Sequence, residues 1–198
     1  MSPPRKVVQY LTTSLAVLLT LGALMWAGDV YRKLFGLLLF PQQLVAGLIG
    51  ISLALAFLHV RADRTKDGRP PWYDLVAASA GLVCGLYVAV HYERMSLDQP
   101  FQTVEGIVLS SIIVVLILES LRRVAGKVLL IILLLFFVYA LFGGYVPGQL
   151  QGRSVDARDL VLYVVLDTHG LVGPIVGIAL TIVVTFLFFG ALLFRSGG

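Results

Sequence analysis

Histidines and their acidic neighbours are the residues of this chain best suited to metal binding or acid–base chemistry. His91 is followed by Glu93 and His169 is preceded by Asp167, so each pair offers an imidazole and a carboxylate two positions apart; His59 is the third histidine. These are ligand types that zinc accepts, although a site needs three or four of them at one point. No nucleotide-binding loop, HExxH or GxSxG pattern indicates a particular reaction. Whether the histidines meet therefore depends on the elements that carry them.

A second set of charges lies between two long apolar runs. Glu119 is followed by Arg122 and Arg123, and this i,i+3 and i,i+4 spacing makes the three side chains neighbours on a helix surface. A local ion pair is the preferred interpretation, and a docking contact for another subunit is the alternative. The flanking runs, Ile107–Leu118 and Val128–Phe142, contain no charge. The cluster is therefore a short charged connection between two apolar helices.

The composition is that of an integral membrane protein. Apolar residues make up 59% of the chain, charged residues make up 13%, and the mean hydropathy is +0.94, whereas soluble domains carry about 25% charged residues. The net charge of +4 does not indicate a nucleic-acid partner, because most cations flank apolar runs, as expected at a membrane surface. Cys84 is the single cysteine, so an intrachain disulfide is excluded.

Six apolar runs are long enough to cross a hydrocarbon core about 30 Å thick, which needs roughly 20 residues of helix. They are Val7–Ala27, Leu44–Val60, Leu75–His91, Val104–Leu121, Val128–Val146 and Val172–Phe194. The first is longer than a signal-peptide core and lacks a good cleavage site, so we expect a retained anchor. The predicted fold is an all-α integral membrane protein with about six transmembrane helices and one or two short interfacial helices.

Two shorter apolar pieces are predicted not to span the membrane. Leu34–Phe40 follows three polar or charged residues and is expected to lie along the bilayer surface. Leu160–Leu166 follows Asp156 and Asp159, which are suited to cap the start of a helix and to match its dipole. This second piece is either interfacial or re-entrant, and the sequence leaves both possibilities open.

The distribution of arginine and lysine predicts the orientation of the chain. With the N-terminus inside, ten of the fifteen cations lie in inner segments, in agreement with the positive-inside bias. The inner set is Arg5, Lys6, Arg61, Arg64, Lys66, Arg69, Arg122, Arg123, Lys127 and Arg195, and the outer set is Arg32, Lys33, Arg94, Arg153 and Arg158. Both termini are therefore expected to face the cytoplasm. Because this topology separates His59 from His91 and His169, it excludes a three-histidine metal site.

No Asp, Glu, Lys or Arg falls in the middle of a predicted span, and Glu105 and Glu119 at the rims of the fourth span come closest. Intramembrane charges usually mark ion or proton paths. We therefore expect neither a pump nor an enzyme, and assign no catalytic, cofactor-binding or metal-binding residue.

The last span opens with Gly173, Pro174 and Gly177. Proline in a first helical turn is ordinary, and the alternative is a broken helix of the kind that builds transporter sites.

Small residues recur at every fourth position along three predicted spans. The stripes are Ala77, Gly81, Gly85 and Ala89; Ala46, Gly50 and Ala54; and Gly173, Gly177, Thr181 and Thr185. In lipid, such faces let helix backbones approach closely, because association there depends on packing. We therefore expect these faces to be helix contacts in a compact bundle.

Five stretches, in this order, carry a family resemblance. They are Pro71–Asp74, Leu118–Arg123, Tyr139–Gly148, His169–Gly177 and Phe189–Gly198. From about Leu39 to its end, the chain resembles the N-terminal part of a fused permease of the tripartite ATP-independent periplasmic (TRAP) transporters. The resemblance is to the branch that works with TAXI-type binding proteins.

The resemblance implies two regions and a set of partners. Residues 1–123 correspond to a small four-helix (Q-type) scaffold region, and residues 124–198 to the start of a large (M-type) permease region. We expect the large region to be truncated, because the later hairpins that hold sodium and substrate are missing. A fragment of a longer protein is the preferred interpretation, and a natural subunit with a separately encoded remainder is the alternative. The resemblance further implies a multi-pass protein of the bacterial inner membrane, with sodium as the coupling ion of the full transporter and organic acids or related solutes as its substrates. The implied partners are the remainder of the large region, a periplasmic TAXI-type binding protein and the lipid bilayer.

Two other functions are weighed against this one. The first is the small membrane subunit of a tripartite tricarboxylate transporter, but the stretches after Tyr139 resemble the large TRAP region instead. The second is a membrane metal-binding protein or enzyme that uses His91, His169 and the nearby acids.

Overall fold

The computed structural model describes residues 5–35, 40–60 and 71–197. In these ranges the chain is almost entirely helical and contains no strand. Six helical segments are long and apolar enough to cross a membrane, so the chain is an all-α membrane protein, as predicted. The elements are α1 (Arg5–Ala27), α2 (Val30–Phe35), α3 (Pro41–His59), α4 (Trp72–Leu97), η1 (Gln99–Phe101), α5 (Val104–Val124), α6 (Lys127–Phe142), η2 (Gly143–Tyr145), η3 (Gly148–Leu150), α7 (Ala157–Leu166), α8 (Pro174–Ile178), the π-helical turn η4 (Ala179–Val183) and α9 (Val184–Arg195).

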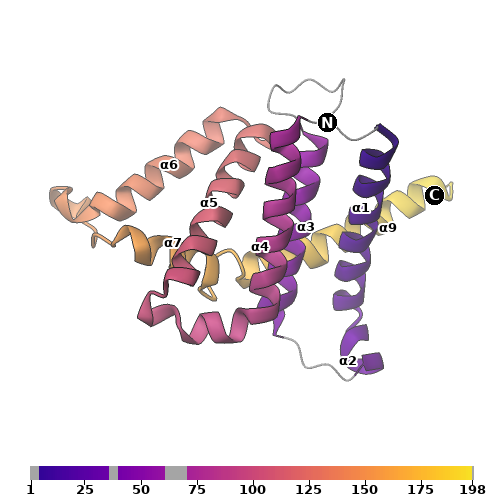
Figure 1. Cartoon of the computed structure of the whole chain (residues 1–198), viewed down its shortest axis with the longest axis horizontal. Helices are drawn as coiled ribbons and strands as arrows, with labels where there is room; N and C mark the ends of the chain where they lie inside the picture. The colour runs from indigo at the N-terminus through magenta and orange to yellow at the C-terminus, as the bar shows by residue number, and fades with distance from the viewer. Residues whose placement is uncertain (1–4, 36–39, 61–70, 198) are drawn as a thin grey trace.

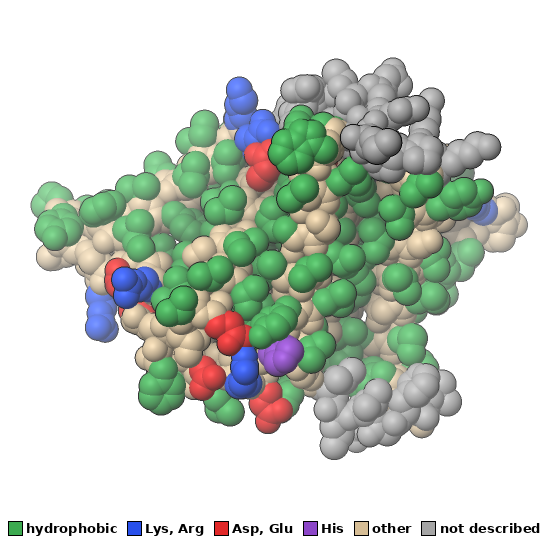
Figure 2. All heavy atoms as spheres, in the orientation of Figure 1, with side chains coloured by type: hydrophobic (Ala, Val, Ile, Leu, Met, Phe, Trp, Pro, Cys, Tyr) green, Lys and Arg blue, Asp and Glu red, His purple; other side chains and the backbone are tan. Residues whose placement is uncertain are grey.

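Helices α3, α4 and α5 form the centre of the bundle (Figure 1). Helix α1 packs on α3, whereas α6 leans away from α5, and α7 lies between the diverging parts of these two helices. The rod formed by α8, η4 and α9 runs across α3 and α1 at a steep angle and contacts both. In Figure 2, hydrophobic side chains cover the middle of the visible face, and charged side chains gather towards its ends. This is the distribution expected for a protein surrounded by lipid.

Local sequence signals account for where several helices begin and end. The side chain of Thr103 caps α5 by accepting a hydrogen bond from the Gly106 N–H (3.3 Å). Asp156 caps α7 by accepting the Ala157 N–H (2.7 Å), so the predicted cap is present. Gly126 has a φ of 100° between α5 and α6, which a residue with a side chain rarely adopts. A sharp junction between these two helices therefore depends on glycine.

The closest helix contact is made by the small-residue faces of α3 and α4. A Cβ atom added to Gly85 would lie 2.5 Å from the Gly50 Cα, and one added to Gly50 would lie 3.0 Å from the Gly85 Cα. Added atoms at Gly81 would meet Leu53 of α3 at 3.0 Å. The prediction that these two stripes are helix contacts is confirmed, because backbones this close leave no space for side chains. On the last span, Thr181 is buried, and Gly177 faces Val45 of α3.

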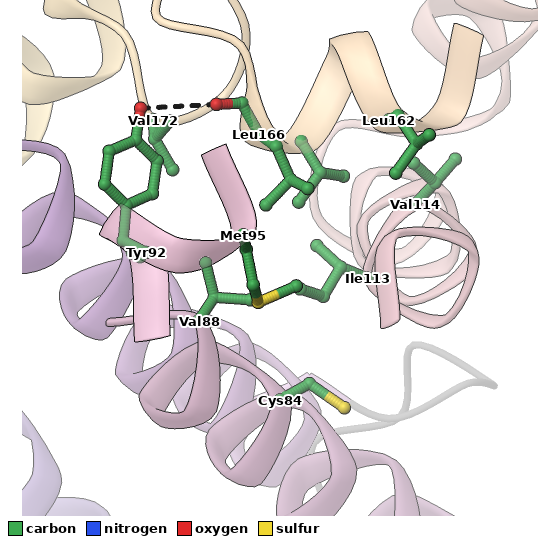
Figure 3. Close-up of a cluster of buried hydrophobic side chains, with 11 residues drawn as sticks. Cys84, Val88, Tyr92, Met95, Ile113, Val114, Leu162, Leu166 and Val172 are labelled. Atoms are coloured by element: carbon green, nitrogen blue, oxygen red, sulfur yellow. Dashed lines mark hydrogen bonds between the residues drawn. The ribbon is translucent and has the colours of Figure 1, made fainter. Parts of the chain in front are cut away.

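The main core lies between α4, α5, α7 and the turn that follows α7 (Figure 3). Val88 of α4 and Ile113 of α5 pack there together with Leu162, Val165 and Leu166 of α7. These three α7 side chains are only 1–2% exposed. The apolar face of α7 is therefore covered by protein, and its contacts lie at the end of α4 and the start of α5.

Several element boundaries differ from the predicted ones by a few residues. Helix α4 continues to Leu97, beyond the predicted end at His91, because the polar residues of its last turns stay helical outside the apolar stretch. The short helix predicted at Leu34–Phe40 begins earlier, at Val30, and is described as far as Phe35. Positions 36–39 of that prediction lie outside the described residues, as do four of the cations used for the orientation, Arg61, Arg64, Lys66 and Arg69.

Candidate functional site

The strongest candidate site is a cluster of charges where α4 begins and α5 ends. We call it the Arg123 cluster; its members are Asp74 of α4 and Glu119, Arg122 and Arg123 of α5. The side chain of Arg123 is 5% exposed and that of Asp74 is 0% exposed. Such burial is unusual for charged residues, which are almost never fully buried unless they are paired.

Arg123 joins three helices through its guanidinium group. Its Nη1 donates to the Asp74 Oδ1 at 2.7 Å and to the Val60 carbonyl at the end of α3 at 3.4 Å. Its Nε donates to the Glu119 Oε1 at 2.7 Å. The guanidinium carbon also lies 4.8 Å from the centroid of the Phe57 ring of α3, within the range of a cation–π contact. The end of α5 is thereby attached to both α3 and α4.

Glu119 and Arg122 form the outer part of the cluster. Arg122 donates from Nε to the Glu119 Oε2 and from Nη2 to the Glu119 Oε1, both at 2.7 Å. This two-point contact is the strong geometry for an arginine–carboxylate pair. The local ion pair expected from the i,i+3 and i,i+4 spacing is therefore present. Both side chains are about one-third exposed, so this outer part lies closer to the surrounding solvent than the pair of Arg123 and Asp74.

The sequence did not predict that Asp74 of α4 pairs with Arg123 of α5 and so connects the two helices. In the sequence, Asp74 stands out only as part of the Pro71–Asp74 stretch. A usable signal was available, because the predicted topology places the start of the third span and the end of the fourth span on the same side of the membrane. An acid and an arginine at those two positions are candidates for pairing. The second carboxylate oxygen of Asp74 has no hydrogen-bond partner among the described residues.

A second polar contact joins α4 and α5 at their opposite ends. Glu105 near the start of α5 accepts hydrogen bonds from the Tyr87 hydroxyl and from the Arg94 Nη2, both on α4. The His91 ring stacks on Tyr87 with centroids 4.4 Å apart. Arg94 and Glu105 are 54% and 41% exposed, so this pair contributes little to stability compared with a buried one. It nevertheless fixes which faces of the two helices meet.

The structure does not gather the histidines into one site. His91 stacks on Tyr87, whereas His169 pairs with Asp167 of its own turn at 3.2 Å and is 80% exposed. In the described part of the chain, no group of three or more histidine, cysteine, aspartate or glutamate side chains is placed to hold a metal. The metal-binding alternative therefore gains no support from this geometry.

Three further predicted residues follow α7: Gly173 lies in the turn before α8, and Pro174 and Gly177 lie in α8. The Leu171 N–H donates to the Val164 carbonyl at 2.7 Å, and the Tyr92 hydroxyl donates to the Leu166 carbonyl at 3.3 Å (Figure 3). These bonds satisfy carbonyls at the end of α7 that have no partner within the helix. An added Cβ at Gly173 would lie 2.6 Å from the Thr168 carbonyl oxygen, so the turn is tightly closed.

The predicted site residues fall into three groups. These are Glu119, Arg122 and Arg123 in the Arg123 cluster; Gly81 and Gly85 on the face of α4 that meets α3; and Gly173, Pro174 and Gly177 at the start of the last span. Asp74 is near the start of α4 and Tyr92 is near its end, and 18 helical residues correspond to roughly 27 Å. The Arg123 cluster and the α7–α8 turn therefore lie at different depths and form no common site. Pro174 begins α8 in the manner of an ordinary first-turn proline.

No family model matches the chain, and neither a curated protein nor a solved structure matches it significantly.

Proposed function

We propose that this chain is a scaffold part of a membrane permease, of the kind implied by its resemblance to TRAP transporters. The observation that carries the proposal is the attachment of α3, α4 and α5 to one another through the buried side chain of Arg123. A part that stays fixed while a neighbour moves needs helices whose relative positions are held by specific contacts.

The contacts between α4 and α5 support such a role. Within the described residues, the ion pairs that join two helices are Arg123–Asp74 at one end of α4 and α5 and Arg94–Glu105 at the other. Helices α3 and α4 are held together along their glycine faces. By contrast, the candidate spans of α1, α6 and α9 are each only 6% buried. Helices α3, α4 and α5 therefore make the most specific contacts with one another.

The distribution of charge also fits a scaffold better than a transport path. Among the described residues, each Asp, Glu, Lys and Arg in a candidate span lies within its first or last turns. Transport sites for ions usually place ionisable or irregular polar groups near the middle of the membrane. On this proposal, the coupling ion, sodium, and the solute bind to other parts of the full transporter.

The proposal assigns residues 1–123 to a four-helix scaffold and residues 124–198 to the beginning of the large permease region. Its partners are the remainder of that region and a periplasmic TAXI-type binding protein, and its location is the bacterial inner membrane with the N-terminus in the cytoplasm. Gly126, with its φ of 100°, lies at the boundary between the two regions.

Two measurements on the purified chain test the proposal. Reconstituted alone in liposomes, the chain is expected to show no ²²Na⁺ uptake above protein-free liposomes. In nanodiscs, spin labels at the exposed positions Val83 of α4 and Val115 of α5 are expected to give one narrow distance distribution. Sodium uptake by the chain alone would contradict the absence of a transport path. A broad or two-peaked distribution would contradict the scaffold role.

A further inference from the structure

An open groove runs between α1 and α3. Its walls are side chains of α1 from Thr12 to Leu24 and of α3 from Ser52 to Val60, and Phe188 of α9 lines it as well. Its volume is about 740 Å³, within the range of roughly 300–1,000 Å³ that is typical of ligand sites. Because both walls belong to candidate membrane spans, the groove opens towards the hydrocarbon part of the bilayer.

The hydroxyl groups in the groove are already satisfied by their own helices. Thr12 and Thr13 both donate to the Gln9 carbonyl at 2.9 Å, Thr20 donates to the Ala16 carbonyl at 2.8 Å, and Ser52 donates to the Leu48 carbonyl at 2.8 Å. A polar transmembrane partner would use such donors for bonds between helices. Here the walls present mainly methyl and methylene groups, a surface suited to a hydrocarbon chain.

One end of the groove is polar. His59, the last residue of α3, is exposed and lines this end. Helix α1 starts at the same end with the sequence Arg5-Lys6 (Figure 1). Two basic residues thus stand in the sequence of the first turn of a helix that lines the groove, and basic residues at a membrane surface attract anionic lipid headgroups. The charge of this end therefore complements a phosphate.

From these three observations, we propose that the groove between α1 and α3 binds one anionic phospholipid, with its acyl chains between the helices and its phosphate at the His59 end. The exposed faces of α6 and α9 are apolar too, but each belongs to a single convex helix. The groove has walls from three helices, so it removes more of a lipid chain from its surroundings and holds the lipid in one place.

Native mass spectrometry of the purified full chain tests the proposal. Dioleoylphosphatidylglycerol is expected to bind with a stoichiometry of one and more tightly than dioleoylphosphatidylcholine. Ala16→Trp and Ala56→Trp each place a large ring in the groove and are expected to weaken binding by about tenfold or more. Leu18→Trp is the matched control, because Leu18 is exposed on α1 outside the groove, and it is expected to bind as the wild type does.

Loss of charge at the polar end is tested separately. Arg5→Gln is expected to weaken binding of phosphatidylglycerol by about two- to fivefold, in line with about 1 kcal/mol for one arginine or lysine near an anionic surface. Its effect on phosphatidylcholine, which has no net charge, is expected to be smaller. Equal weakening of both lipids would contradict the selection of an anionic headgroup at this end.

A photo-crosslinking experiment on the unmodified chain avoids any effect of the substitutions on folding. Phosphatidylglycerol with a diazirine on an acyl chain is expected to label peptides that contain Thr12–Leu24 and Ser52–Val60 in preference to α6. Equal or stronger labelling of α6 would overturn the proposal. A dimer that Ala16→Trp dissociates, with lipid binding unchanged, would also overturn it by showing that a second copy fills the groove.

Discussion

Arg123 and Asp74 are 49 residues apart in the sequence, and their side chains form a 2.7 Å ion pair that is 5% and 0% exposed. The pair joins the end of α5 to the beginning of α4. Because burial removes both charges from water, the attraction between them has to offset a large desolvation cost. Removing one partner is therefore far more harmful than the presence of the pair is beneficial.

Replacement of Arg123 by alanine is expected to lower the free energy of unfolding by about 3–5 kcal/mol, because Asp74 is left buried and charged. Arg122→Ala is the matched control. Arg122 is 34% exposed, and the loss of such a partly exposed pair is expected to cost about 1 kcal/mol or less. Unfolding in detergent followed by circular dichroism measures both values. Equal losses would show that the pair of Arg123 and Asp74 is not buried in solution.

A double substitution separates the contribution of the Arg123–Asp74 pair to stability from that of the other contacts of Arg123. Asp74→Ala added to Arg123→Ala removes the unpaired charge, and part of the lost stability is expected to return. A double variant less stable than either single variant would mean that Arg123 acts mainly through Glu119 and Phe57.

Gly85→Ala is expected to destabilise the bundle by about 1–3 kcal/mol, the usual cost of an added methyl group in a packed core. The new Cβ would lie 2.5 Å from the Gly50 Cα, so α3 and α4 would have to separate. Gly190→Ala serves as the control, because nothing lies within 4 Å of a Cβ at that position. Thermal unfolding of the two variants in the same detergent tests this contact, and equal midpoints would argue against it.

The position of α7 is tested by disulfide formation in a Cys84→Ser background. A Cβ at Gly106 of α5 would lie 3.1 Å from the Leu162 side chain, so Gly106→Cys with Leu162→Cys is expected to form a disulfide on mild oxidation. Gly106→Cys with Tyr163→Cys is not, because Tyr163 is half-exposed and adjacent on the helix. An α7 that lay freely at the membrane surface would give similar yields for both pairs.

The proposed orientation is tested by labelling cysteines from one side of the membrane. Glu93→Cys and Lys127→Cys place thiols at exposed positions at opposite ends of the bundle, and the native Cys84 is buried. A membrane-impermeant maleimide is expected to label position 93 in intact spheroplasts and position 127 only after permeabilisation. The opposite pattern would place the N-terminus outside.

Sequence reasoning recovers the parts of this fold that depend on local composition. The six spans follow from the length of their apolar runs, and the contact between Gly50 and Gly85 follows from small residues at every fourth position. The polar end of α4 was missed because hydropathy does not detect a helix that continues past the apolar stretch. In the structure, Arg94 in this polar end contacts Glu105 of α5.

The tertiary features could not be read in the same way. The pairing of Asp74 with Arg123 and the burial of Leu162 depend on how helices from distant parts of the chain pack. A sequence gives the charge and polarity of these residues but not the distances between them. For α7, the apolar face was evident, and only the structure identifies α5 as the surface that covers it.

The pair of Asp74 and Arg123 has a consequence for biosynthesis. When α3 and α4 have entered the membrane, the carboxylate of Asp74 has no arginine to receive it until α5 has been made, 49 residues later. Because Asp74 lies in the first turn of α4, it can wait in the hydrated headgroup layer during that interval. Its withdrawal from water then coincides with the arrival of α5. The ion pair between Asp74 and Arg123 therefore forms only at the step of assembly in which α5 packs against α3 and α4.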